Sequence, residues 1–286
     1  MIKIFLKAFD EWRHGRASNY AASLTFYALF ALAPIIIIMI AVAGAIFGDQ
    51  AARGEIVGQI STIVGSEIAS AIQVIVENAQ LSGSNIVFTI LSLFVFLFAA
   101  SRVITSLKYA LNRTWDKDGM RHKKIHHAIK SKFLSILLII SLGLIFVLLI
   151  FVSGIMATIW VYVANFLPVG SSLLQVLNLI VSFGFITFLV AAINKYLPDI
   201  KIAWKDVWIG AAVTTILFMF GNYLIGLYIR NITVSSIYGA AGSLVLILIW
   251  LYYSFQIFLF GAEFTRVYSE EQGSYRGIFK KILDLF

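Results

Sequence analysis

Six apolar segments, each about as long as a membrane crossing, constrain this chain more than any other feature. Of its 286 residues, 60% are hydrophobic and 13% are charged, whereas a soluble domain has about 45–50% apolar and about 25% charged residues. A spanning helix needs about 20 mainly apolar residues, and backbone groups in hydrocarbon must be satisfied within the segment, which favours helices. We predict an all-α polytopic membrane protein, a single domain over residues 1–286. Its six transmembrane helices are Ser23–Phe47, Ile86–Leu111, Phe133–Val163, Leu173–Tyr196, Val207–Arg230 and Ala240–Val267.

The distribution of positive charge orients these segments. Twenty of the 22 Lys and Arg residues lie at the two termini, in the second and fourth connections, or in the span ends next to them, and only Arg53 and Arg230 lie at the other three connections. Connections rich in Lys and Arg stay on the cytoplasmic side of a membrane. We therefore predict that both termini are cytoplasmic, which agrees with an even number of spans.

Three flanking regions are predicted outside the spans. Residues 1–20 form a short amphipathic helix with Ile2, Phe5, Phe9 and Trp12 on one side, which either lies on the inner leaflet or packs on the protein's own cytoplasmic loops. Residues 48–85 are nearly free of Lys and Arg and predict an extracytoplasmic helical cap. Residues 268–286 form a cytoplasmic tail.

The sequence lacks the residues and motifs that most classes of enzyme require. The chain has no cysteine, which excludes disulfides, thiolate metal sites and Cys nucleophiles. His122 and His126 are spaced for one helix face, but Arg121, Lys123 and Lys124 surround them, and cations oppose a bound metal. No metalloprotease, P-loop or nucleophile-elbow motif occurs. We expect no enzyme activity, no cofactor, no metal and no nucleic-acid partner.

Charged residues inside the apolar segments are the first candidates for function, because a charge at a helix centre costs about 2.5–3.5 kcal/mol on insertion scales. Arg102 lies in the inner part of the second span and Glu263 in the last turns of the sixth. Their similar predicted depth suggests an ion pair or a shared polar pocket. The alternative is that Glu263 pairs with Arg266, while Arg102 extends its side chain to the interface.

A polar stripe on the sixth span supplies the other candidates. Tyr253, Gln256 and Glu263 follow helical spacing on one face, and Tyr27 and Asn222 occupy compatible positions on the first and fifth spans. Such stripes either fasten helices together or line a solvated cavity, and the spacing does not separate the two. Pro34, near the middle of the first span, predicts a kink.

Several short motifs carry a resemblance to a known family. They are AASLTFYALFALAP at 21–34, LNRTW at 111–115, YLP at 196–198, YG at 238–239, WLYY at 250–253 and GAE at 261–263. In this order and spacing, from about residue 10 to 268, the chain resembles the YihY/virulence factor BrkB family. The resemblance implies a six-span helical protein of the bacterial cytoplasmic membrane, and some family members are regarded as transporters. An old ribonuclease label on the family is regarded as a misassignment, and the family supplies no accepted catalytic or ligand residues.

We expect a transporter or permease that moves a small solute or ion through a polar cavity between its helices. The alternative is a membrane protein that does not transport and instead organises lipid or envelope partners. Anionic headgroups on the cytoplasmic face are the expected lipid partners in both cases, because the basic residues gather there.

Overall fold

The computed structural model describes residues 1–47, 86–115, 171–200, 202–231 and 242–275, with short pieces at 61, 68–70 and 72–73. Most of these residues are helical, the rest form turns and short connections, and none of them is in a strand, as predicted. The predicted third span, most of the predicted cap, and residues 276–286 of the predicted tail lie outside them. The helices are α1 (Ile2–His14), α2 (Ala17–Phe47), α5 (Ile86–Trp115), α7 (Ser171–Tyr196), α8 (Trp204–Asn231) and α10 (Gly242–Glu271).

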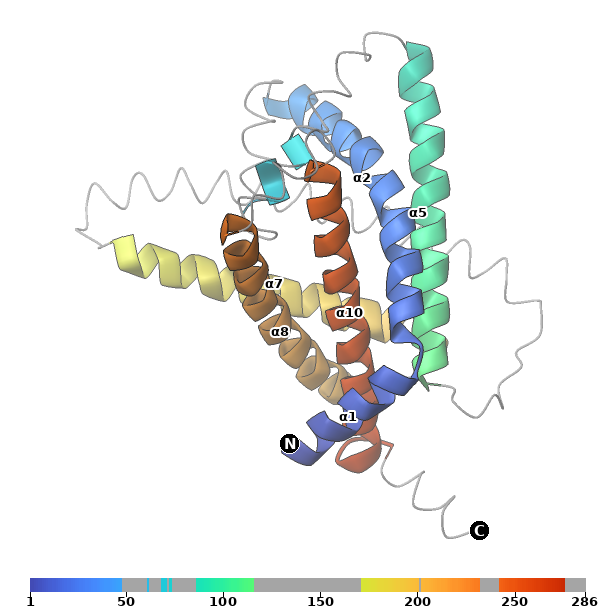
Figure 1. Ribbon diagram of the computed structural model, residues 1–286, viewed down its shortest axis with the longest axis vertical. Coiled ribbons are helices and arrows are strands. Elements are labelled where there is room, and N and C mark those ends of the chain that lie inside the picture. Colours follow the sequence, from blue (N-terminus) through green and yellow to red (C-terminus); the bar gives the residue numbers. More distant parts are fainter. Residues whose placement is uncertain are drawn as a thin grey trace, which may run out of the picture.

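Five of the predicted apolar segments are thus helices; α2, α5, α8 and α10 continue beyond their predicted inner ends, and α7 ends at Tyr196 as predicted. Within the described residues, three stretches are long and apolar enough to cross a membrane: Leu179–Tyr196, Trp204–Leu227 and Gly242–Glu271. Figure 1 shows α2 changing direction about half-way along its length, where Pro34 lies in the sequence. A proline removes a backbone hydrogen bond and clashes with the preceding turn, which accounts for the bend.

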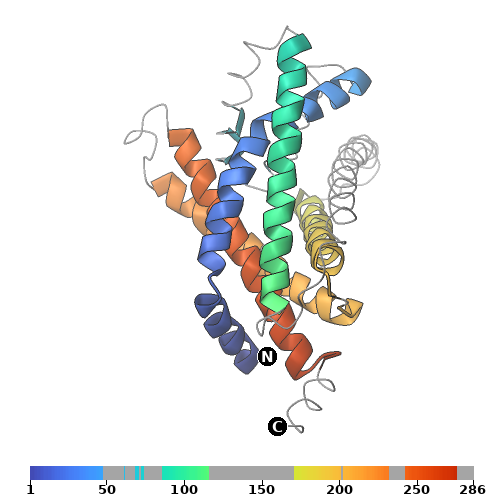
Figure 2. The same cartoon turned by 90° about the vertical axis from the view of Figure 1, so that its right-hand side faces the viewer.

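Helix α10 is the centre of the described bundle. It packs against α1, α2, α5 and α8, while α2 packs along α5 and α7 packs on α8. Both views show α2 and α5 running side by side (Figures 1 and 2). One apolar core joins α2, α5 and α10 around Leu24, Leu107, Leu111 and Leu259. A second joins α1 to α10 through Ile4, Ala8 and Phe264.

The contacts between α8 and α10 are made by paired glycine and threonine residues. A Cβ at Gly261 of α10 would lie 1.8 Å from Thr214 Oγ1 of α8, and a Cβ at Gly210 of α8 would lie 1.8 Å from Thr265 Oγ1 of α10. Each threonine hydroxyl donates to a backbone carbonyl of its own helix, at Gly210 and Gly261 respectively. Small residues let two backbones approach closely, and the hydroxyls are satisfied without crossing the interface.

The N-terminal helix α1 is half packed and half exposed. Ile4 and Ala8 are buried against α10, and the Phe5 ring lies 5.1 Å from the Phe260 ring. Ile2 and Leu6 remain exposed. The helix ends at His14, and α2 already begins at Ala17, so the predicted amphipathic segment 1–20 includes the turn and the first residues of α2. Packing on α10, rather than on loops, was not among the sequence expectations.

Polar end of the helix bundle

The ends of the described helices that carry the predicted cytoplasmic charges lie together. Figure 1 places α1 beside the C-terminal ends of α5 and α10. Asn112 of α5 donates to Asp199, in the turn after α7, at 2.9 Å, and Lys108 of α5 forms an ion pair with Asp199 at 2.9 Å. These contacts bring the ends of α5 and α7 together, and the side of the membrane on which they lie stays a prediction.

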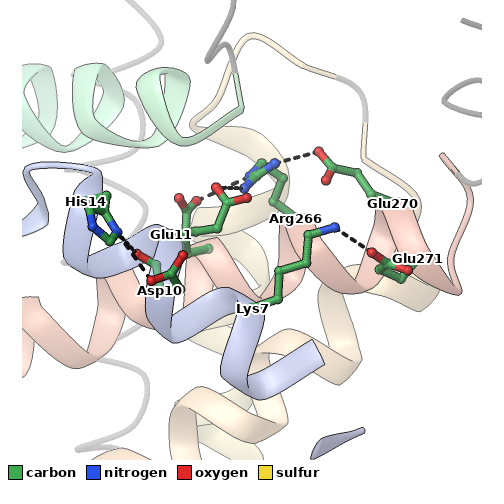
Figure 3. A network of polar contacts seen from close by, with 8 residues as sticks. Lys7, Asp10, Glu11, His14, Arg266, Glu270 and Glu271 are labelled. Atoms are coloured by element: carbon green, nitrogen blue, oxygen red, sulfur yellow. Dashed lines mark hydrogen bonds and ion pairs between the residues drawn. The ribbon is translucent and has the colours of Figure 1, made fainter. Parts of the chain in front are cut away.

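Arg266 of α10 is the most enclosed cation of this end. Its side chain is 6% exposed and contacts three carboxylates: Glu263 at 3.3 Å, Glu270 at 2.7 Å and Glu11 of α1 at 2.7 Å. Figure 3 shows Glu11 reaching from α1 to the guanidinium, with Glu270 on the other side. The side chain of Glu263 is 5% exposed. Because a buried charge is tolerated only when paired, the guanidinium and its carboxylates depend on one another.

A second ion pair fastens α1 to the end of α10. Lys7 of α1 contacts Glu271, and both side chains are about half exposed. Exposed pairs contribute little, typically about 0.2–1 kcal/mol. Of the two ion pairs, the contact between Glu11 and Arg266 is therefore the one expected to contribute more to holding α1 on α10.

Asp206, in the first turn of α8, holds the end of α10 from the other side. It is buried and accepts hydrogen bonds from Ser269 Oγ at 2.8 Å and from the backbone amide of Ser274 at 3.0 Å. The Ser274 hydroxyl donates to the same carboxylate oxygen. An acidic side chain in the first turn also suits the dipole of α8.

Replacing Asp206 with alanine is expected to release this turn. Ser269, Ser274 and their neighbours lose a charged acceptor, which costs about 1–3 kcal/mol of the free energy of unfolding. Hydrogen–deuterium exchange should rise over residues 269–275, and the same exchange should be unchanged when the exposed Asp10 is replaced with alanine. Equal exchange in both variants would show that Asp206 does not hold the turn.

A cavity of about 600 Å³ opens between α1, α2, α5 and α10 at this polar end. Its polar lining consists of Trp12, His14, Arg16, Tyr20, Tyr109, Arg113, Thr114 and Glu263, and its apolar lining includes Ala17, Ala110 and Leu259. Glu263 is the residue it shares with the carboxylate cluster around Arg266. The cavity therefore joins an exposed basic rim to a buried acidic wall.

The two tyrosines of the cavity lie edge to face, with ring centroids 5.8 Å apart. Burial raises the pKa of the Tyr20 hydroxyl, with Tyr109 acting in the same direction and the guanidiniums of Arg113 and Arg16 acting against it. Tyr20 is therefore a neutral hydroxyl near pH 7, able to donate and accept hydrogen bonds.

The sequence candidates do not converge on a single site. Arg102 is exposed and lies 5.3 Å from the centre of the Phe98 ring, whereas Glu263 is buried beside Arg266. The predicted pair between Arg102 and Glu263 is therefore absent from the described residues, and the alternative pairing of Glu263 with Arg266 is present. Arg102 lies about half-way along α5, whereas Glu263 lines the cavity beside Tyr109 and Arg113, nearer the C-terminal end of that helix.

The polar stripe of α10 takes part largely in helix contacts. Tyr253 packs on Gly221 of α8, where an added Cβ would lie 1.5 Å from the tyrosine oxygen. Asn222 accepts a hydrogen bond from Trp250 Nε1 at 3.1 Å. Gln256 donates to the Tyr252 hydroxyl at 2.7 Å, while its Oε1 is buried without a partner among the described residues. Tyr27 lies half buried, with its ring 5.7 Å from that of Phe26.

Comparison with known proteins decides the family. The family model described as virulence factor BrkB matches residues 8–281, nearly the whole chain. The chain belongs to the BrkB family. The family suggested by the sequence motifs is thereby confirmed, and no solved structure matches this chain.

Curated relatives of this BrkB-family chain are described as UPF0761 membrane proteins. One from Tolumonas auensis is 36% identical over 36% of this chain and 33% of its own length. One from Azotobacter vinelandii is 26% identical over 91% of this chain, which spans 63% of that relative. One from Actinobacillus pleuropneumoniae is 26% identical over 94% of both chains. These relatives support a membrane protein and name no activity.

Apart from Glu263, the residues of the cavity were missed as functional candidates in this BrkB-family sequence. Arg16 and Arg113 were attributed to membrane topology, and Arg266 was considered only as an alternative partner of Glu263. The spacing of Glu263, Arg266 and Glu270, at three and four residues, indicates contacts on one helix face. No local pattern indicates that Glu11, more than 250 residues away in the chain, completes the cluster.

Proposed function

We propose that this protein is a transporter or permease of the bacterial inner membrane. It crosses the membrane six times, has cytoplasmic termini, and moves a small solute or ion. The observation that carries the proposal is the cavity between α1, α2, α5 and α10, which opens at the basic end and has Glu263 in its wall. A polar cavity between helices that is reached from one side of the membrane is the expected entrance to a transport site.

A polar face leads from this cavity towards the middle of α10. Gln256 lies about two turns before Glu263 on the same face, because seven residues span about two helical turns. Its Oε1 is buried and has no partner among the described residues. A buried, unpaired polar atom in a membrane helix is costly, and this supports a polar route beyond the cavity.

Replacing Glu263 with glutamine is expected to reduce transport about tenfold or more, because a charged wall group contributes about 1.5–3 kcal/mol to a bound polar partner. Uptake of labelled sodium, rubidium, chloride, phosphate and glycerol 3-phosphate into proteoliposomes measures it. Arg102→Gln is the matched control, since it removes an exposed charge outside the cavity. Uptake no faster than in protein-free liposomes for every probe would contradict the proposal.

A specific feature of α1 favours a second candidate function. Ile2, Leu6 and Phe9 are exposed apolar side chains on a helix that also carries Lys3 and Lys7. Such a helix suits an anionic membrane surface, as a protein that organises lipid or envelope partners requires. Stable co-purification of one partner, together with failure of all the uptake assays, would favour this function over transport.

A further inference from the structure

The turn between α1 and α2 holds an arginine in a conformation that arginine rarely adopts. Arg16 has a φ of 58°, in the left-handed region. Among the described non-glycine residues it is the only one with a positive φ. The left-handed conformation costs a residue with a Cβ about 1–2 kcal/mol. Gly15, which would adopt it without strain, precedes Arg16 and has an ordinary φ of −80°. The strained position lies on the rim of the cavity, where strain is expected to serve a function.

A second arginine also lines the cavity. Arg113 comes from the end of α5 and Arg16 from the start of α2, and both line the cavity. Within the described residues neither arginine forms an ion pair with an acidic side chain, whereas Arg266 has three such partners. Glu263 is one of three carboxylates that share the single charge of Arg266, so the wall at Glu263 stays acidic. The positive charge of the cavity lies at Arg16 and Arg113.

The cavity also contains a hydrogen-bond donor without a partner. Trp12 Nε1 is buried and has no acceptor among the described residues, although a buried indole N–H ordinarily finds one. Indole nitrogen donates only, so the missing partner is an acceptor. The first backbone amides of α2, which begins at Ala17 in the cavity wall, add donors and the positive end of the helix dipole.

We propose that this cavity binds a phosphate group, held by the guanidiniums of Arg16 and Arg113 with Trp12 Nε1 as an additional donor. Guanidinium groups match phosphate oxygens geometrically and hold them with two parallel hydrogen bonds. Tyr109 and Thr114 supply hydroxyls for the remaining oxygens or for a glycerol-like substituent. A volume of about 600 Å³ accommodates a phosphate ester of headgroup size rather than a bare ion.

Two sources supply this chemistry: a soluble phosphate ester and the headgroup of a phospholipid. The polar end of the bundle lies where lipid phosphates gather at a membrane surface, if the predicted spans are placed in a bilayer. This proposal rests on the proposed transport function, because the bound phosphate ester would be either the transported solute or a lipid at the entrance of the transport route. Binding and uptake are separate measurements, so each idea can fail alone.

The test measures ligand binding to the purified full-length chain in dodecyl maltoside by thermal shift and titration calorimetry. The probes are inorganic phosphate, glycerol 3-phosphate, dioctanoyl-phosphatidylglycerol, and dioctanoylglycerol as the lipid without phosphate, all at matched ionic strength. Arg16→Gly and Arg113→Gln are each expected to raise the Kd of a phosphate probe about tenfold or more, the loss expected for a charge-assisted hydrogen bond. Arg13→Gln is the matched control, because Arg13 is an exposed cation of α1 that does not line the cavity.

Arg16→Gly has a second readout that a merely structural residue would not give. Glycine adopts the left-handed turn without strain, so this variant should unfold at the same or a higher temperature while binding phosphate more weakly. A lower unfolding temperature together with unchanged binding would overturn the assignment of Arg16 as a ligand.

The pattern across probes distinguishes the sources. Equal affinity for glycerol 3-phosphate and dioctanoyl-phosphatidylglycerol supports a soluble ester, and affinity for the phospholipid alone supports a headgroup. Binding of dioctanoylglycerol as tight as that of the phospholipid, equal losses in Arg13→Gln, or no binding of any phosphate probe would each overturn the proposal. Phosphate binding without uptake of any probe would keep the site and contradict transport.

Discussion

Replacing Arg266 with methionine is expected to lower the free energy of unfolding by about 3–5 kcal/mol, because it leaves buried carboxylates without their cation. Methionine keeps much of the length and apolar character of the side chain, so the loss reports charge rather than volume. Glu263 suffers most, since it is the most enclosed of the three partners. Unfolding in dodecyl maltoside micelles with increasing sodium dodecyl sulfate, followed by circular dichroism, measures the change.

Matched variants separate this effect from a general loss of positive charge. Arg102→Met removes an exposed cation from α5 and should change the free energy of unfolding by less than about 0.5 kcal/mol. Adding Glu263→Gln to Arg266→Met should recover part of the loss, because the glutamine carries no buried charge. A double variant as unstable as Arg266→Met, or an equal loss in Arg102→Met, would show that the cluster does not depend on charge pairing.

Replacing Gly261 with alanine is expected to destabilise the contact between α8 and α10 by about 1–3 kcal/mol. The added Cβ would lie 1.8 Å from Thr214 Oγ1 and 2.8 Å from Thr214 Cβ, so a change of side-chain rotamer alone does not make room. The two helices must separate slightly, which also disturbs the reciprocal contact between Gly210 and Thr265. The same micelle titration measures the loss.

Gly184→Ala on α7 is the control for this substitution, because nothing lies within 4 Å of its added Cβ. Alanine is the better helix former, so this variant should be neutral or slightly more stable. Thr214→Ala combined with Gly261→Ala should recover part of the stability, since it removes the nearest atom but leaves the Thr214 Cβ position occupied. Equal effects at Gly184 and Gly261 would contradict close packing at Gly261.

The helices of this protein follow from apolar runs, because a membrane-length stretch leaves the backbone little choice except a helix. The apolar runs do not indicate which side of each helix faces the bundle and which side faces outward. Arg102 and Glu263 have similar predicted depth, but the former faces outward over Phe98 and the latter inward to Arg266. Hydrophobicity distinguishes sides poorly in helices that are apolar almost all round, and this is why the predicted pairing of Arg102 with Glu263 was wrong.

The cavity could not be predicted for a different reason. It depends on the turn at Gly15 and Arg16, which directs α1 back across α10 and brings Glu11 to Arg266. Positive charge near a membrane surface is explained by topology in most positions, so Arg16 and Arg113 carried no distinguishing signal. The six-span arrangement as a whole stays a prediction, because the third predicted span lies outside the described residues.

The reciprocal glycine and threonine contacts have a consequence for movement. Thr265 of α10 occupies the space beside Gly210 of α8, and Thr214 of α8 occupies the space beside Gly261 of α10. Sliding either helix along its partner would therefore move each threonine out of its space and against the neighbouring backbone. A transport cycle would therefore carry α8 and α10 as one rigid body. Opening and closing would take place where α10 meets α2 and α5, the same boundary along which the cavity lies.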